Sequence, residues 1–210
     1  MSKPALLVLT AVLAATLILA AGVGSVAIPP VTILKVVLSR IPALGAVLER
    51  DWSPAFETIV WQIRIPRVLL SGLAGAGLAA AGAVFQGLFR NPMADPYVLG
   101  ASSGASVGAA LAVIFAPAFG FLGLGAVPLA AFAGAILAVT LVYTIARSSG
   151  RVPVLSLLLA GVAVGSFLSS VVSLLIFLSA RDEKLWQIVF WLMGGFSGAT
   201  WTKFWTALPY

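Results

Sequence analysis

Long runs without a charged residue constrain the fold of this chain more than any other feature of its sequence. Five are present: Pro4–Leu34, Val68–Phe89, Pro96–Ala146, Val152–Ala180 and Leu185–Thr202. A helix that crosses a bilayer needs about 20 apolar residues. Charged residues make up only 9% of the chain, against about 25% in an average soluble domain. The sequence therefore predicts a membrane protein without a soluble domain.

The runs predict an all-α polytopic bundle of about five complete spans, tightly packed and rich in Gly and Ala. The third run holds two spans, because a Pro- and Gly-rich break interrupts it at Ala116–Gly125. The helices are expected near residues 5–27, 65–89, 97–116, 124–146 and 153–179, followed by a short aromatic surface helix near 184–195 and the start of a sixth span near 200. The polar stretch around residues 29–62 is expected to hold a short amphipathic helix, Val31–Ile41. Residues 1–210 are treated as a single domain.

The first run has an alternative reading as a cleaved signal peptide. Lys3 precedes a long apolar core, and Ser25-Val26-Ala27 gives a small-x-small ending. The single Lys and the length of the core favour an uncleaved first span.

Small and polar residues on the second and third predicted spans suggest tight helix packing or a lined pathway. Small faces let membrane helices approach closely. Gln86 is the strongly polar side chain of the second span; it either lines a pathway or makes an ordinary interhelical hydrogen bond. Gly and Ser crowd the third span between Gly100 and Gly108, where Ser103 and Ser106 are candidate pathway residues.

The residue inventory argues against catalysis by this chain. The sequence has no His and no Cys, so the commonest base and metal ligand and any thiol nucleophile are excluded. A dinucleotide-type match begins at Gly75 and a G-x-S-x-G match at Gly100, but both lie in predicted membrane helices and lack the required strand context. No P-loop is present, and no carboxylate falls mid-span, where it would suggest a proton relay. We expect no enzyme activity, cofactor or metal site.

One block of sequence has a specific resemblance. It runs through Trp61-Gln-Ile-Arg64-Ile-Pro66-Arg67, Gln86-Gly-Leu-Phe-Arg90-Asn91-Pro92-Met93-Ala94-Asp95-Pro96, and then Leu99-Gly100 and Gly104-Ala105. The later segments Leu157–Gly161 and Trp191-Leu-Met-Gly-Gly195-Phe with Trp201 agree in order and spacing. The chain resembles the FecCD-type permease subunits of bacterial ABC importers for vitamin B12, haem and iron–siderophores.

The resemblance implies a multi-pass subunit of the cytoplasmic (inner) membrane that passes a metal chelate inward. In this family a ten-helix permease pairs with a second copy, and the pathway lies between the two. Two ATP-binding subunits dock inside the cell, and a periplasmic or lipid-anchored substrate-binding protein docks outside. No nucleic acid is implied as a partner.

The resemblance also assigns roles to residues. Arg64 and Arg67 match the arginines that meet acidic residues of the binding protein, although snorkelling at a helix end is the alternative. Asn91, Pro92 and Met93 match an inner gate, although a rigid turn without a gating role would look the same. The loop 148–155 matches the other inner-gate region, with Val154 and Leu155 in place of the family's small polar residues.

Two features depart from the family pattern. The chain covers about the first two-thirds of the usual permease, without the loop that docks into the ATPase; a truncated, non-transporting fragment or one half of a split permease is therefore the alternative. With the N-terminus inside, four cations lie inside and eight outside, which reverses the usual bias. We retain the orientation that the resemblance implies, with the N-terminus inside. In that orientation the external arginines have a binding role, and five carboxylates also lie on the external side.

Overall fold

A computed structural model describes residues 3–93, 95–115, 120–121, 124–147, 152–179 and 183–209. The chain divides into two compact units. The first comprises residues 1–76 and 196–210, and the second comprises residues 77–195. The long helix α5 runs from the first unit into the second.

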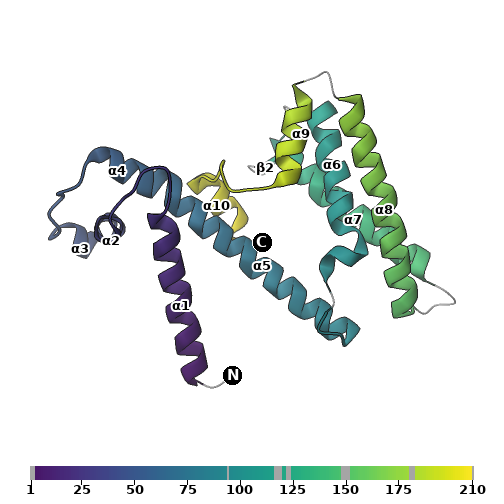
Figure 1. Ribbon diagram of the computed structural model, residues 1–210, viewed down its shortest axis with the longest axis horizontal. Helices are drawn as coiled ribbons and strands as arrows, with labels where there is room; N and C mark the ends of the chain where they lie inside the picture. Colours follow the sequence, from purple (N-terminus) through teal and green to yellow (C-terminus); the bar gives the residue numbers. More distant parts are fainter. Residues whose placement is uncertain are drawn as a thin grey trace. The chain divides into compact units, whose positions relative to one another are not determined.

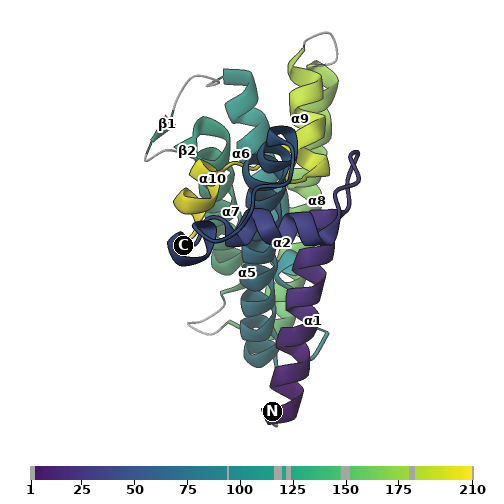
Figure 2. The ribbon, with the colours of Figure 1, turned by 90° about the vertical axis from the view of Figure 1, so that its left-hand side faces the viewer.

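The first unit contains a membrane-length helix and a group of short helices. Its elements are α1 (Lys3–Gly22), α2 (Pro30–Leu38), α3 (Pro42–Gly45), α4 (Pro54–Thr58), the π-helical segment η1 (Ile59–Arg64), the start of α5 (Ile65–Phe89) and α10 (Trp201–Ala207). Helix α2 lies across the end of α1 (Figure 2). It confirms the amphipathic helix predicted over 31–41, and α10 begins where a sixth span was predicted to begin.

The second predicted span begins earlier than expected, at Pro54 rather than near residue 65. Helices α4, η1 and α5 follow one another without a break over 36 residues. Ser53 caps this helix through a hydrogen bond from the Phe56 N–H to its Oγ at 3.3 Å, and Pro54 occupies the first turn. A Ser–Pro pair is a normal helix start, but the polar residues that follow concealed it in the hydropathy pattern.

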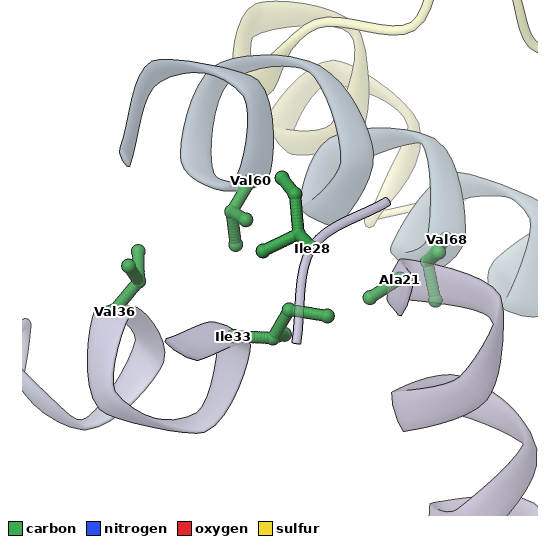
Figure 3. Packing of buried hydrophobic residues seen from close by; sticks show 6 residues of the cluster. All are labelled: Ala21, Ile28, Ile33, Val36, Val60 and Val68. Atoms are coloured by element: carbon green, nitrogen blue, oxygen red, sulfur yellow. The ribbon is translucent and has the colours of Figure 1, made fainter. Parts of the chain in front are cut away.

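The core of the first unit joins the end of α1 to α2 and to the long helix (Figure 3). Side chains of six buried residues meet there: Ala21, Ile28, Ile33, Val36, Val60 and Val68. Ala21 and Val68 face each other across α1 and α5, and Ile28 points toward Val60 of η1. The segment after α1 is therefore held between three helices by apolar packing.

The second unit contains the rest of α5, the 3₁₀ turn η2 (Pro96–Leu99), α6 (Ala101–Phe115), α7 (Ala126–Ala146), α8 (Val154–Leu178) and α9 (Lys184–Met193). Helices α6, α7, α8 and α9 lie side by side as a bundle (Figure 1). The predicted break in the third run contains two antiparallel strands of two residues each, β1 (Gly120–Phe121) and β2 (Leu124–Gly125). The predicted all-α membrane fold is confirmed, apart from this short ribbon.

Glycine contacts hold α6 against α7. A Cβ atom at Gly104 would overlap the Gly134 carbonyl, and one at Gly134 would overlap the Gly104 carbonyl. Gly108 has the same relation to the carbonyl of Ala130. Such close backbone approach provides packing contacts that larger residues would prevent.

Four helices in the described part of the chain are long and apolar enough to span a membrane: Lys3–Gly22, Pro54–Phe89, Ala126–Ala146 and Val154–Leu178. Helix α6 is apolar but shorter. The 36-residue helix is about 54 Å long, whereas the hydrocarbon core is about 30 Å thick. The charge-free part after Arg67, Val68–Phe89, is long enough by itself to cross that core.

Candidate functional site

Arg64 is buried, unlike a typical docking residue. It is 7% exposed at the end of η1. Its Nη1 donates to the carbonyls of Ala21 and Gly22, both at 2.8 Å, and its Nη2 donates to the carbonyl of Val26. All three acceptors belong to the end of α1 and the segment after it.

Arg67 lies one turn further along and is exposed. Its Nε donates to the Phe196 carbonyl at 3.1 Å, and its Nη2 donates to the Ser197 carbonyl at 3.3 Å. These bonds are longer than those of Arg64. The structure thus brings the two predicted arginines to one helix but gives them different surroundings.

Paired charges and aromatic rings lie before the arginines on the same unit. Lys35 Nζ contacts Asp51 Oδ2 at 2.5 Å, and Arg40 pairs with Glu57. The hydrogen bond from Lys35 holds the pKa of Asp51 below its usual value of 3.8. Arg40 also lies 4.9 Å from the centre of the Trp61 ring, in cation–π range.

Trp201 ties α10 to the π-helical segment. Its indole nitrogen donates to the Trp61 carbonyl at 2.8 Å, and the two ring centroids are 4.8 Å apart. In the sequence, Trp201 stands out only as part of the motif that begins at Trp191. Its contact joins residues 140 positions apart, and no local pattern predicts such a contact.

The predicted gate loop is shaped by two side-chain caps. Asn91 Oδ1 accepts from the Met93 N–H at 2.9 Å, and Asp95 Oδ1 accepts from the Tyr97 N–H at 2.8 Å. Each bond is an Asx-type turn, the local geometry that Asn and Asp favour. Pro92 lies inside the first turn. Met93 itself is 84% exposed.

The second gate region is described from residue 152 onward; residues 148–151 lie outside the described residues. Val154 begins α8 and lines an apolar pocket of about 300 Å³ with Leu88 and Phe89 from the end of α5. Leu155 is exposed. The structure therefore brings Val154 near the start of the Asn91 turn, because its pocket neighbour Phe89 lies two residues before Asn91.

Two predicted pathway serines lie together on α6. They line a small cavity of about 260 Å³ with Ser102, Ser169, Val172 and Leu192. The Oγ atoms of Ser103 and Ser169 are 3.2 Å apart and join α6 to α8, while Ser106 Oγ donates to the Ser102 carbonyl at 2.9 Å. Ser169 was missed by the sequence analysis; its spacing with Ser166, Ser170 and Ser173 on α8 was the available signal.

Gln86 is exposed on α5 and lies apart from this cavity's lining. A larger groove of about 660 Å³ between α6 and α7 is lined entirely by apolar residues and glycine. It offers no polar side chain to a charged ligand, and the serine cavity is the more polar of the two.

Lys184 is a further residue that sequence reasoning missed. Its Nζ donates to the Ile114 carbonyl at 2.9 Å, at the end of α6. Cations are favoured at helix C-termini, where backbone carbonyls lack partners. Within the described ranges no group of three or more His, Cys, Asp or Glu could hold a metal ion.

Comparison with known proteins confirms the resemblance. The FecCD transport family profile matches residues 12–210. The cobalamin import system permease protein BtuC of Halobacterium salinarum is 45% identical over 167 residues, which cover 80% of this chain and 44% of that protein. The molybdate import system permease protein MolB of Haemophilus influenzae is 34% identical over 199 residues, covering 93% and 55%.

The fold agrees with a solved relative. A structure described as "an inward-facing conformation of a putative metal-chelate type ABC transporter" superposes with a TM-score of 0.74 at 31% identity, covering 97% of this chain and 57% of that one. The chain spans about half the length of the curated relatives it matches. Those relatives are permease proteins of import systems, so the expectation that this chain is not an enzyme is confirmed. With the family profile, the sequence identities and the fold in agreement, this membrane chain belongs to the FecCD transport family.

Proposed function

We propose that the chain is the N-terminal part of the permease subunit of an ABC importer in the cytoplasmic membrane. Its substrate is a metal chelate: cobalamin, iron–siderophore or haem. The observation that carries the proposal is the structural match to a metal-chelate transporter along 97% of the chain. Relatives named for cobalamin and for molybdate indicate that the family framework accepts more than one cargo.

The remaining partners follow from the same proposal. A second permease copy completes the pathway, two ATP-binding subunits supply the energy, and a substrate-binding protein delivers the cargo. Arg67 meets a carboxylate of that binding protein, because it is exposed and its bonds to carbonyls can be exchanged for a bidentate pair. The Asn91 turn with Val154 forms the inner gate, and Ser103 and Ser106 line the path.

The family orientation gains support from the partners of the outer cations. Six of the eight cations assigned outside are engaged by a carboxylate or a backbone carbonyl: Lys35, Arg40, Arg64, Arg67, Lys184 and Lys203. These outer cations therefore make contacts within the folded chain. That role is separate from the distribution of Lys and Arg that guides membrane insertion.

A split permease is the second candidate, favoured by open glycine positions along α5. Among the described residues, a Cβ atom at Gly72, Gly75, Gly77, Gly82 or Gly87 would meet nothing within 4 Å. Small residues on membrane helices gain stability by close packing. In a split permease, helices of the second half would cover these positions.

The transport proposal is tested by uptake in cells that carry this chain together with its neighbouring genes. We expect uptake of labelled cobalamin, ferric siderophore or haem that stops when the ATP-binding partner is inactivated. Labelled molybdate is the comparison cargo. Uptake of none of these, with no ATP-binding protein recovered on purification of the chain, would contradict the proposal. Uptake restored only by a separately encoded second half would support the split permease.

Orientation is tested by single-cysteine labelling, since the chain has no native Cys. Ser53→Cys, at the start of α4, is expected to react with an impermeant maleimide in intact cells. Met93 is highly exposed on the gate loop, and Met93→Cys is expected to react only after the membrane is permeabilised. The reverse pattern would place Arg67 inside and end its proposed docking role.

A further inference from the structure

The C-terminal end of α1 lacks the usual closing residue. A helix end leaves about four carbonyls without intrahelical partners, and a glycine with positive φ commonly closes it. Among the described residues, the glycines with positive φ are Gly100, Gly194 and Gly195; none belongs to α1. Val23 bonds back to the Leu19 carbonyl, which leaves the carbonyls of Ala21 and Gly22 to find donors elsewhere.

Arg64 supplies those donors from another helix. Its guanidinium donates to both carbonyls at 2.8 Å and reaches the Val26 carbonyl with its other terminal nitrogen. A guanidinium presents five N–H donors in a planar fork and stays charged when buried. The partial negative charge of a helix C-terminus favours a cation there, and no carboxylate pairs with Arg64 in the described part of the chain.

The long helix presents Arg64 to α1 together with apolar residues. Val60, Arg64 and Val68 follow at intervals of four and are all buried. Val60 and Val68 pack into the core that contains Ala21 and Ile28 (Figure 3). The arginine is thus part of a packed face, with its charged group directed at the α1 carbonyls rather than at solvent.

Gly24 supports the same conclusion. A Cβ atom there would lie 2.7 Å from Arg64 Nη2. A free arginine would move away from such a contact, but this guanidinium is bonded to three carbonyls. The absence of a side chain at residue 24 is therefore matched to the bound position of Arg64.

We infer that Arg64 is a positioning residue: it caps α1 from η1 and holds the segment 23–28 against the long helix. Of the two arginines, Arg67 alone is then available to a carboxylate of a docking partner. The capping of α1 by Arg64 does not depend on the proposed function, whereas the assignment of docking to Arg67 alone rests on it.

The capping role is tested by the reactivity of a buried reporter, Ile28→Cys, which replaces a side chain only 4% exposed. In detergent or lipid, its maleimide labelling rate reports local opening of the segment. Arg64→Gln is expected to raise that rate about tenfold or more, because hydrogen bonds to a charged group are lost. Arg64→Lys, which keeps a cation for the same carbonyls, should reverse most of the increase, and Arg67→Gln should leave the rate unchanged.

A further variant perturbs the guanidinium without changing any charge, and a neighbouring glycine provides its control. Gly24→Ala is expected to raise the labelling rate of Ile28→Cys several-fold, because its methyl group displaces Nη2. Gly22→Ala is the matched control, since a Cβ there makes only an ordinary contact of 3.5 Å with Ile33. These two variants and Arg64→Lys also keep the test decisive if Arg64→Gln fails to accumulate.

The division of labour is tested by docking of the binding protein at low and high ionic strength. Arg67→Gln should reduce the salt dependence of the association rate, and Arg64→Lys should leave it unchanged. Parent-like labelling in Arg64→Gln and Gly24→Ala, with a lost salt dependence in Arg64→Gln, would overturn the inference. If the unsubstituted chain docks at no ionic strength, the proposed function fails, while the labelling result still decides the capping role.

Discussion

Replacing Gly134 by alanine is expected to destabilise the chain by about 1–3 kcal/mol, the usual cost of overpacking. The new methyl group would overlap the Gly104 carbonyl across the contact between α6 and α7. Neither atom can turn away, because both partners are backbone of regular helices. The helices must separate, and the contacts around Gly108 are loosened with them.

The direction of this effect is diagnostic, because helix propensity alone predicts the opposite. Alanine favours a helix interior over glycine by about 1 kcal/mol. Gly165→Ala is the matched control: it lies within α8, and its Cβ would make only ordinary contacts, 3.7 Å from Gly100 Cα and 3.8 Å from Ser103 Oγ. The free energy of unfolding, measured by detergent-titrated circular dichroism, should fall for Gly134→Ala and stay level or rise for Gly165→Ala. A rise in both would show that α6 and α7 do not meet as described.

Reversing the charge of Arg67 is expected to weaken docking of the substrate-binding protein at least about tenfold, because like charges set against each other at an interface cost several kcal/mol. This expectation rests on the proposed function. Arg67 is exposed, and its two bonds to the carbonyls of Phe196 and Ser197 are replaceable. Most of the loss should appear in the association rate and should shrink as salt is raised.

The control for Arg67→Glu is Arg147→Glu, which makes the same change in net charge. Arg147 follows α7 and is exposed, and the proposed orientation places it on the inner side. Surface plasmon resonance on permease in nanodiscs measures both variants against the same binding protein. Equal weakening by the two substitutions would mean that overall charge, rather than an Arg67 contact, drives the association.

The element types were predictable from local sequence, and their boundaries partly so. Apolar runs bounded by charges locate α7 and α8 to within two residues, and they locate α1 to within five, since it was expected over 5–27 and ends at Gly22. The start of the long helix was wrong by eleven residues, Pro54 against 65, because Glu57 and Gln62 resemble a loop by polarity. The Ser53–Pro54 pair is itself a helix start signal, and it outweighs the polarity of the residues that follow it.

The candidate site was predictable as a set of residues but not as an arrangement. The motif names Arg64 and Arg67 alike, yet one is buried against the end of α1 and the other is exposed. Ser103 was chosen for its place in a Gly- and Ser-rich helix, whereas its partner Ser169 lies 66 residues away. The cap that Lys184 gives to α6 spans 70 residues, and local pattern analysis gives no weight to such pairs.

The sequence by itself determined that this chain is a helical membrane protein of the FecCD family, because apolar length, missing charge and motif order are all read along the chain. Only the tertiary structure decided how the polar groups are used. In an apolar surrounding every buried N–H donor and carbonyl must find a partner, and which partner it finds depends on which helices meet. Arg64 became the cap of α1, rather than a second exposed arginine, because the long helix packs where the α1 carbonyls end.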